Sequence, residues 1–340
     1  MTSRTYTTDV AIIGAGPVGL FAVFQCGMLK MRCHVIDALE VAGGQCRALY
    51  PEKPIYDIPA YPKISAGDLI DQLEAQAAPF DPVYHLNQKV LDISKTDDDR
   101  WLVDTDKGTS VNAKVVIVAG GVGAFGPNRP PLDHIESYEG KSIFYAVKSR
   151  NDFKDRTLVI AGGGDSAVDW AVSLSEVAKK IYVVHRRDKF RAAPDMVDKL
   201  HALHDAGTIE IITNYQLHGL EGDMNLLSAV TIVDFEGNVR KLDAEILLPF
   251  FGLSMNLGPI THWGLELEKK HIKVDPASCA TNIPGVYAIG DIAHYPGKLK
   301  LILTGFAEAA LAAHSSYKLV HPDQVLHFEY STTQGVPGQK

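Results

Sequence analysis

Apolar residues in this chain fall into short continuous runs that end at glycine-rich turns, a pattern typical of parallel strands buried on both faces. The first run covers residues 10–13 and leads into the turn GAGPVG at 14–19, which continues as an apolar helix. A second run, residues 33–36, follows that helix and ends at Asp37. The pattern predicts a strand–helix–strand unit of an α/β domain.

The same order of elements recurs in the second half of the chain. Residues 157–161 predict a strand, the turn GGGDSA follows at 162–167, and residues 168–178 predict a helix. A strand predicted at 181–184 completes the unit. The repeat therefore predicts two Rossmann-like domains of α/β class.

The remaining segments predict the other helices, strands and loops of the two domains. Residues 91–112 and 217–248 alternate polar and apolar positions around turn residues, which predicts antiparallel hairpins. Residues 40–63 carry several prolines and two adjacent glycines, so a long functional loop is expected there, and the proline-rich residues 126–131 predict a connection between domains. Further helices are expected at 66–80, 195–206 and 304–320, and further strands at 83–90, 113–118, 209–212 and 286–289.

Composition sets limits on the class of protein. The chain has 340 residues, of which 46% are hydrophobic and 22% charged, as in a globular enzyme of about two domains. Its net charge of −8 argues against a general nucleic-acid binder. No apolar run approaches the roughly 20 residues that span a bilayer, and the N-terminus lacks a signal-peptide layout, so a cytoplasmic protein without a membrane segment is expected.

Cysteine and histidine spacing offers no metal site or disulfide framework. The four cysteines include no CxxC pair and predict reduced, mostly buried thiols. His201 and His204 are spaced three residues apart on a predicted helix, which can suit a metal ion. Because no third ligand is near in sequence, a solvated helix face is expected there instead.

The first glycine turn has the chemistry of a dinucleotide site. Gly14 permits the tight turn, Gly16 lets backbone amides approach a pyrophosphate, and Gly19 lets the helix pack closely on the strand. The N-terminus of the helix offers free N–H groups and the positive end of its dipole to the phosphates. Asp37 stands where a carboxylate can accept hydrogen bonds from a ribose.

The second glycine turn ends differently. Gly162 and Gly164 repeat the turn, and Asp165 and Ser166, which follow within it, are also expected to contact the nucleotide. Arginines, however, stand where the first unit has its acid. A guanidinium forms paired, charge-assisted bonds to phosphate, so this site is expected to prefer NADP to NAD. The arginines concerned are Arg186, Arg187 and Arg191. The economical assignment is FAD at the first site and NADPH at the second, with paired dehydrogenase domains as the alternative.

Five motifs in order give the chain a clear resemblance to the low-molecular-weight thioredoxin reductase family. They are GAGPVG, GGQ at 43–45, GGGDSA, HRRDKFRA at 185–192 and YAIGD at 287–291. The resemblance implies two three-layer (ββα) dinucleotide-binding domains, the second inserted in the first. It assigns residues 1–122 and 255–340 to the FAD domain, with a tail at 321–340, and residues 123–254 to the NADPH domain.

One departure from that family changes the expected activity. The segment 139–156, where thioredoxin reductases carry a CxxC pair, contains no cysteine, so dithiol transfer to thioredoxin by that route is excluded. The chain resembles more closely the thioredoxin-reductase-like ferredoxin–NADP⁺ reductases, through PEKPIYDIPAYPK after Tyr50, GGGDSAVDWA, TGFAEAA and a C-terminal extension. This resemblance implies one tightly bound FAD per subunit, NADP(H) as co-substrate, ferredoxin or flavodoxin as partner, and a homodimer.

The resemblance also implies which residues contact the flavin nucleotide. Tyr50 is expected to stack on one face of the ring and Tyr330 on the other, with Phe328 as the alternative to Tyr330. The implied FAD contacts are Asp37, Gln45, Tyr50, Val90 through its backbone, Phe125, Asp291 and Thr332. Docking of an acidic ferredoxin would need a basic patch, for which the candidates are Arg47, Lys53, Lys63, Lys298 and Lys300.

Three functions remain open from the sequence. The first is electron transfer between NADPH and ferredoxin or flavodoxin. The second keeps the flavin but reduces another acceptor, such as a ferric chelate, a quinone or oxygen. The third is a nucleotide-binding redox sensor with slow turnover.

Overall fold

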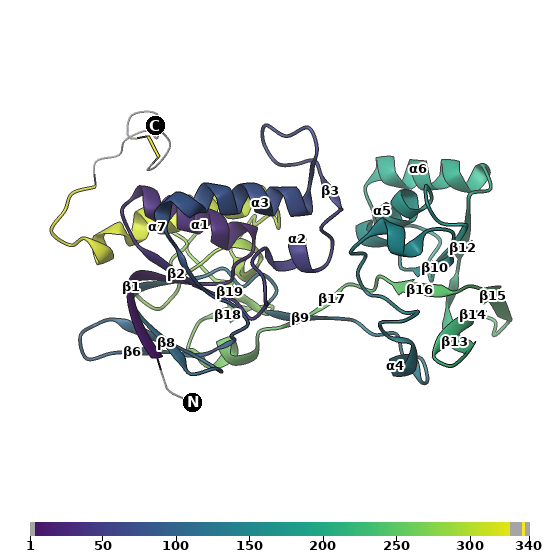
Figure 1. Ribbon diagram of the computed structural model, residues 1–340, viewed down its shortest axis with the longest axis horizontal. Helices are drawn as coiled ribbons and strands as arrows, with labels where there is room; N and C mark the ends of the chain where they lie inside the picture. Colours follow the sequence, from purple (N-terminus) through teal and green to yellow (C-terminus); the bar gives the residue numbers. More distant parts are fainter. Residues whose placement is uncertain (1–3, 327–334, 337–340) are drawn as a thin grey trace. The chain divides into compact units, whose positions relative to one another are not determined.

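The computed structural model describes residues 4–326 and 335–336, and its contacts divide the chain into two units (Figure 1). The first unit combines Met1–Phe125 with Met255–Lys340, and the second is Gly126–Ser254. The chain crosses between them in two strands that pair with each other, β9 (Ala124–Pro127) and β17 (Leu253–Asn256). The second unit is thus an insertion in the first.

A sheet with strand order β5-β2-β1-β8-β7-β6 forms the centre of the first unit. Strands β5, β2, β1 and β8 run parallel, with Ile12 of β1 opposite Val35 of β2 and Ile117 of β8. Strand β20 pairs in parallel with the end of β8. The strands are β1 (Arg4–Ile13), β2 (Cys33–Ile36), β5 (Val83–His85), β6 (Val90–Lys95), β7 (Trp101–Thr105), β8 (Thr109–Val118) and β20 (Val286–Ala288).

Both faces of this sheet are buried, which explains the continuous apolar run at the end of β1. Val10 and Ile12 pack with the helices, whereas Ala11 and Ile13 belong to a second core on the other face, with Val103 of β7. The helices on the first face are α1 (Pro17–Met28), α3 (Ala66–Ala77) and α7 (Ile302–Val320), which Figure 1 shows lying along the sheet.

Helix α3 begins where a capping residue predicts it. The Ser65 hydroxyl accepts a hydrogen bond from the N–H of Asp68 at 3.0 Å, which satisfies one free donor of the first turn. Smaller elements complete the unit. They are α2 (Gly44–Ala48), β3 (Pro54–Ile55), β4 (Ile64–Ser65), η1 (Ala78–Phe80), η3 (Gly258–His262), β18 (Leu267–Glu268), β19 (His271–Lys273), η4 (Gly290–Ile292) and β21 (Ala293–His294).

The second unit has a parallel sheet of order β12-β11-β10-β16 and an antiparallel sheet of order β13-β14-β15. Residues of both sheets share one apolar core, among them Val159, Val230 and Leu247. The strands are β10 (Thr157–Ala161), β11 (Lys180–His185), β12 (Ile209–Thr213), β13 (Tyr215–Asp223), β14 (Leu226–Asp234), β15 (Val239–Asp243) and β16 (Ile246–Pro249). The helices are α4 (Ile135–Tyr138), η2 (Arg150–Phe153), α5 (Asp165–Leu174) and α6 (Pro194–Asp205).

The predicted strand at 83–90 is wrong, and the predicted strand at 113–118 is confirmed as part of a longer strand. The strand expected at 83–90 is divided into β5 and the start of β6, because Asn87 takes a positive φ of 55° and its N–H bonds to the carbonyl of Leu39 at 2.7 Å. The strand expected at 113–118 is only the second half of β8. Its first half pairs antiparallel with β7 and its second half parallel with β20.

Helix boundaries also differ from the prediction. Helix α5 begins at Asp165 and ends at Leu174, earlier at both ends than the predicted 168–178, and α7 begins at Ile302 rather than Thr304. In the described part of the chain, no helix has both the length and the apolar character needed to cross a membrane.

Candidate functional site

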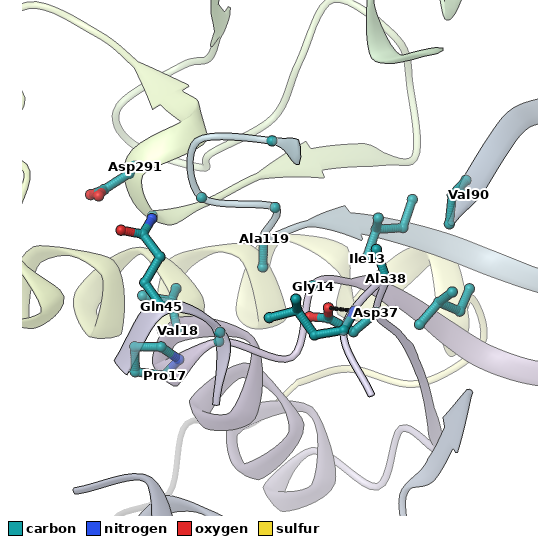
Figure 2. A pocket seen from close by; sticks show the side chains of 18 of the residues that line it. Ile13, Gly14, Pro17, Val18, Asp37, Ala38, Gln45, Val90, Ala119 and Asp291 are labelled. Carbon is teal, nitrogen blue, oxygen red and sulfur yellow. Dashed lines mark hydrogen bonds between the residues drawn. The ribbon is translucent and has the colours of Figure 1, made fainter. Parts of the chain in front are cut away.

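A cavity of about 460 Å³ opens in the first unit where β1, β2 and β8 end. It is elongated: Figure 2 shows Gln45 and Asp291 toward one end, and Asp37 and Val90 toward the other. The predicted FAD contacts that line it are Gly14, Gly16, Asp37, Gln45, Tyr50, Val90 and Asp291. The structure therefore brings together residues that lie far apart in the sequence.

The glycine turn at the centre of the cavity has no room for side chains at two positions. Gly14 has a φ of +113°, and a Cβ there would lie 2.3 Å from the carbonyl oxygen of Ala119. A Cβ on Gly19 would lie 1.9 Å from the carbonyl oxygen of Gly14, so Gly19 lies behind the cavity and sets the approach of α1 to the turn. Gly16 is the N-cap of α1, and a Cβ built on it meets nothing closer than 4.0 Å. The open side of the turn is thus beside the free N–H groups of the helix, where an anion can bind.

Asp37 ties the end of β2 to this turn. Its Oδ2 accepts a hydrogen bond from the N–H of Ala15 at 2.6 Å, and its Oδ1 accepts one from Leu39 at 2.8 Å. Burial raises the pKa of Asp37, and these two backbone bonds oppose the rise. Each carboxylate oxygen has a further lone pair, so Asp37 can both hold the turn and accept a bond from a ribose hydroxyl.

The loop that supplies Gln45 and Tyr50 is held by an arginine. Arg47 of α2 donates hydrogen bonds to the carbonyl of Ala42 at 3.1 Å and to Glu74 of α3 at 3.0 Å, and it also pairs with Asp71. These contacts fix the loop against α3, so that Gln45 and Tyr50 can face the cavity. Arg47 is therefore engaged within the molecule and is a poor candidate for docking a partner.

Cys46 and Tyr50 are neutral groups in the cavity wall. The thiol of Cys46 lies 4.0 Å from the hydroxyl of Tyr50. Burial raises the pKa of Cys46 to about 11 and also raises the pKa of Tyr50. Because only a thiolate attacks a disulfide, this cysteine is not prepared for thiol exchange.

Asp291 lies in a turn whose backbone is hydrogen-bonded to a buried carboxylate. Gly290 has a φ of +74°, and its N–H donates to Oε2 of Glu308 at 2.7 Å. Oε1 of Glu308 accepts from the hydroxyl of Tyr295 at 2.7 Å and from the ammonium of Lys298. Glu308 belongs to α7, whose first residue, Ile302, also lines the cavity, so one carboxylate couples the Asp291 turn to that helix.

Sequence reasoning missed this network and misread one of its members. Lys298, a docking candidate by sequence, is buried in the ion pair with Glu308, and Lys300 bonds to Nε2 of His271 at 2.8 Å. Among the docking candidates, Lys63 is exposed and Lys53 is half-buried. The sequence TGFAE at 304–308 predicted the start of a helix, but nothing local indicates burial of the Glu308 carboxylate.

The apolar wall of the cavity was also missed. Leu257, Ile260 and Trp263 line it from the segment that follows β17, and the Trp263 indole donates to the carbonyl of Leu91 at 3.2 Å. Of the other predicted residues, Phe125 lies in β9 and only its backbone is described. Tyr330, Thr332 and Phe328 lie outside the described residues.

The second glycine turn repeats the first in the second unit. Gly162 has a φ of +151°, and a Cβ there would lie 2.6 Å from the carbonyl oxygen of Phe250. Gly164 is the N-cap of α5, and a Cβ on it would meet no atom within 4 Å. Asp165 and Ser166 follow as the first residues of α5, both exposed.

The three predicted arginines follow β11 with their side chains exposed. Within the described part of the chain, Arg186, Arg187 and Arg191 form no ion pair with a carboxylate. The arginine loop, residues 185–193, returns to the glycine turn, where the N–H of Arg191 donates to the carbonyl of Gly163 at 2.6 Å. Three unpaired guanidinium groups near a helix N-terminus form a local environment suited to phosphate.

Comparison with known proteins gives a family match and curated relatives over nearly the whole chain. Residues 8–315 match the pyridine nucleotide-disulphide oxidoreductase family. A ferredoxin–NADP reductase of Paramagnetospirillum magneticum is 60% identical over 332 residues, covering 98% of each chain. A ferredoxin–NADP reductase of Rickettsia felis is 61% identical over 330 residues, covering 97% of this chain and 98% of the relative.

Solved structures confirm the predicted fold class. The thioredoxin reductase of T. acidophilum has a TM-score of 0.80 at 23% identity, covering 92% of this chain and 98% of its own. That of Lactococcus lactis has a TM-score of 0.79 at 24% identity, covering 93% and 99%. At these identities the likeness concerns the fold, which is thioredoxin-reductase-like.

Proposed function

The chain belongs to the pyridine nucleotide-disulphide oxidoreductase family, and from that premise we propose that it is an NADPH-dependent flavoprotein that transfers electrons between NADP(H) and ferredoxin or flavodoxin. The observation that carries the proposal is the identity of about 60%, over nearly the whole chain, to proteins named ferredoxin–NADP reductase. Oxidoreductase chemistry with FAD and NADP(H) follows from the family. Thioredoxin is not the proposed partner, because residues 139–156 contain no cysteine.

The residues of the cavity fit FAD. The glycine turn leaves its open side to the N-terminus of α1, which suits a pyrophosphate, and Asp37 can accept a bond from the adenosine ribose. Gln45 and Asp291, toward the other end of the cavity, offer polar groups to the chain and ring of the flavin. Held by these residues, FAD would supply the redox chemistry that converts two-electron hydride donation by NADPH into one-electron reduction of a carrier.

The protein's own part in this reaction is to bind, orient and shield. Tyr50, neutral and largely buried, is proposed to stack on the flavin ring, and Tyr330 or Phe328 to cover its other face. The positive end of α7, which begins beside the cavity, favours negative charge on the bound ring. Hydride transfer needs no general acid or base, which agrees with the neutral Cys46 and Tyr50.

In the second unit, the proposed role of Arg186, Arg187 and Arg191 is to bind the 2′-phosphate of NADPH. The support is their position after β11 and the lack of carboxylate partners in the described residues. We expect Arg186→Ala to raise the KM for NADPH by roughly tenfold, since a charge-assisted bond is lost, and to leave the KM for NADH unchanged.

One assay tests the function directly. NADPH oxidation is followed with ferredoxin and cytochrome c, with ferredoxin omitted in one control and NADH supplied in another. Ferredoxin-dependent reduction of cytochrome c with NADPH supports the proposal. Turnover on ferric chelates or quinones without coupling to ferredoxin would replace it with a diaphorase, and negligible turnover with a redox sensor.

The resemblance further supports a homodimer located in the cytoplasm. Light scattering on the purified holoenzyme should give twice the mass of one chain, and cell fractionation should recover the protein in the soluble fraction. A monomeric mass would refute the dimer.

A further inference from the structure

Asp165 stands at a position where its charge opposes the ligand expected there. It is the first residue of α5, directly after the glycine turn that is proposed to bind the pyrophosphate of NADP(H). A carboxylate at a helix N-terminus stabilises the helix, but it repels a phosphate bound at the same end. Direct contact with the nucleotide, which the sequence predicted for Asp165, would therefore cost binding energy.

The structure gives the carboxylate another partner. Oδ1 of Asp165 accepts a hydrogen bond from the backbone N–H of Ala193 at 3.0 Å. On the same side of the turn, the N–H of Arg191 donates to the carbonyl of Gly163 at 2.6 Å. Two hydrogen bonds thus join the glycine turn to the end of the arginine loop, which carries all three arginines.

The start of the arginine loop is fixed by aromatic packing. The ring of His185 occupies the space beside Gly163, where a Cβ would lie 2.2 Å from it. Phe190 stacks on His185 with ring centroids 5.3 Å apart and planes 22° apart, and Nε2 of His185 lies 3.2 Å from the carbonyl of Lys189. The loop is therefore held at both ends, and its guanidinium groups project from a fixed backbone.

A loop whose backbone is already fixed loses less conformational entropy when its three arginine side chains close on a phosphate. We propose that Asp165 is a positioning residue that selects the 2′-phosphate of NADP(H) by holding the arginine loop in place, without contact to the nucleotide. This proposal rests on the proposed function, because it takes the second site to bind NADP(H). It predicts that loss of Asp165 weakens ligands that carry a 2′-phosphate and spares those that lack one.

The test compares two ligands that differ by that phosphate alone. Adenosine 2′,5′-bisphosphate and adenosine 5′-monophosphate are titrated calorimetrically into the holoenzyme and its variants. For Asp165→Ala we expect binding of the bisphosphate to weaken roughly three- to tenfold relative to that of the monophosphate, the worth of one hydrogen bond. The repulsion that is lost with the carboxylate acts on the 5′-phosphate of both ligands and cancels in this ratio. Asp165→Asn keeps an acceptor oxygen and should restore the wild-type ratio of the two affinities.

A control variant and measurements of folding distinguish a positioning role from a general loss of structure. Asp195→Ala removes another first-turn acid, one that pairs with Lys199 at 2.6 Å in α6, and should change neither affinity. Far-UV circular dichroism and the flavin spectrum of each variant should match wild type. Equal weakening of both ligands by Asp165→Ala, or no change in their ratio, would overturn the positioning role.

The same titrations distinguish this failure from failure of the proposed function. A wild-type protein that binds the two ligands equally well does not recognise the 2′-phosphate, which overturns the assignment of NADP(H) and this proposal with it. A wild-type protein that prefers the bisphosphate, with an Asp165→Ala variant that keeps the same preference, overturns only the role of Asp165.

Discussion

Replacing Lys298 by methionine should destabilise the first unit more than any surface charge change. The side chains of Lys298 and Glu308 are each only 3% exposed, and they form an ion pair beneath the Asp291 turn. The carboxylate also accepts from Gly290 and Tyr295, at 2.7 Å each. Lys298→Met leaves a buried carboxylate with two neutral donors and no counter-charge.

The expected loss follows from this burial. Removing one partner of a buried ion pair costs about 3–5 kcal/mol, because the remaining charge is neither solvated nor compensated. For a unit of this size, that loss lowers the Tm by roughly 6–20 °C. The double variant Lys298→Met/Glu308→Gln removes both charges and keeps an amide oxygen for the N–H of Gly290, so it should be more stable than Lys298→Met alone.

Thermal unfolding of the holoenzyme measures the effect through two signals, the fluorescence of released FAD and far-UV circular dichroism. FAD release reports the first unit directly, because Gly290 precedes Asp291 in the cavity wall. Lys273→Met is the matched control, since Lys273 and Glu266 are about 60% exposed and their contact, 3.5 Å long, is worth little. A fall in Tm below about 2 °C for Lys298→Met, or a double variant less stable than the single one, would refute the reasoning.

Three further changes test other parts of the structure. Gly14→Ala should abolish FAD retention, because its Cβ would lie 2.3 Å from the carbonyl oxygen of Ala119; normal flavin absorbance per protein would contradict this. Arg47→Ala should speed FAD dissociation and proteolysis within residues 40–63 by freeing that loop from α3, and unchanged rates would count against it. Burial and the neighbouring His85 lower the pKa of His34 to about 4, so the unfolded chain takes up the proton first and stability falls as pH drops from 6.5 toward 4. Urea unfolding should show a loss of about 2 kcal/mol between pH 7 and pH 5 that His34→Gln removes, and equal pH dependence of the variant would disprove the link.

The local sequence pattern was enough to predict elements whose buried positions and capping residues lie within their own segment. Residues 10–13 are apolar at every position because both faces of β1 are covered, and Ser65 caps α3 with its own side chain. The division of the predicted strand at 83–90 could not be read in this way. It depends on the bond from Asn87 to Leu39, and those residues meet only in the folded unit.

Prediction of the candidate site from the sequence has the same limit. Gly14, Asp37 and Tyr50 could be predicted because a motif carries each of them, and all three line the cavity. Glu308 and Lys298 could not, because an acid on a helix and a lysine in a loop are ordinarily solvated. Their burial arises only when α7 packs behind the Asp291 turn.

The two glycine turns are joined to the segment after the next strand by different hydrogen bonds, and this difference gives a role to the acid at the start of α5. In the first unit, the acid after β2 closes the turn itself, since Asp37 accepts from the N–H of Ala15. In the second unit, Arg186 stands at nearly the corresponding position, and a guanidinium cannot accept a hydrogen bond. The closing bonds come instead from Arg191 to Gly163 and from Ala193 to Asp165. Where an arginine replaces the acid after the strand, Asp165 on the helix side of the turn is the side-chain acceptor that joins the turn to the segment after the strand.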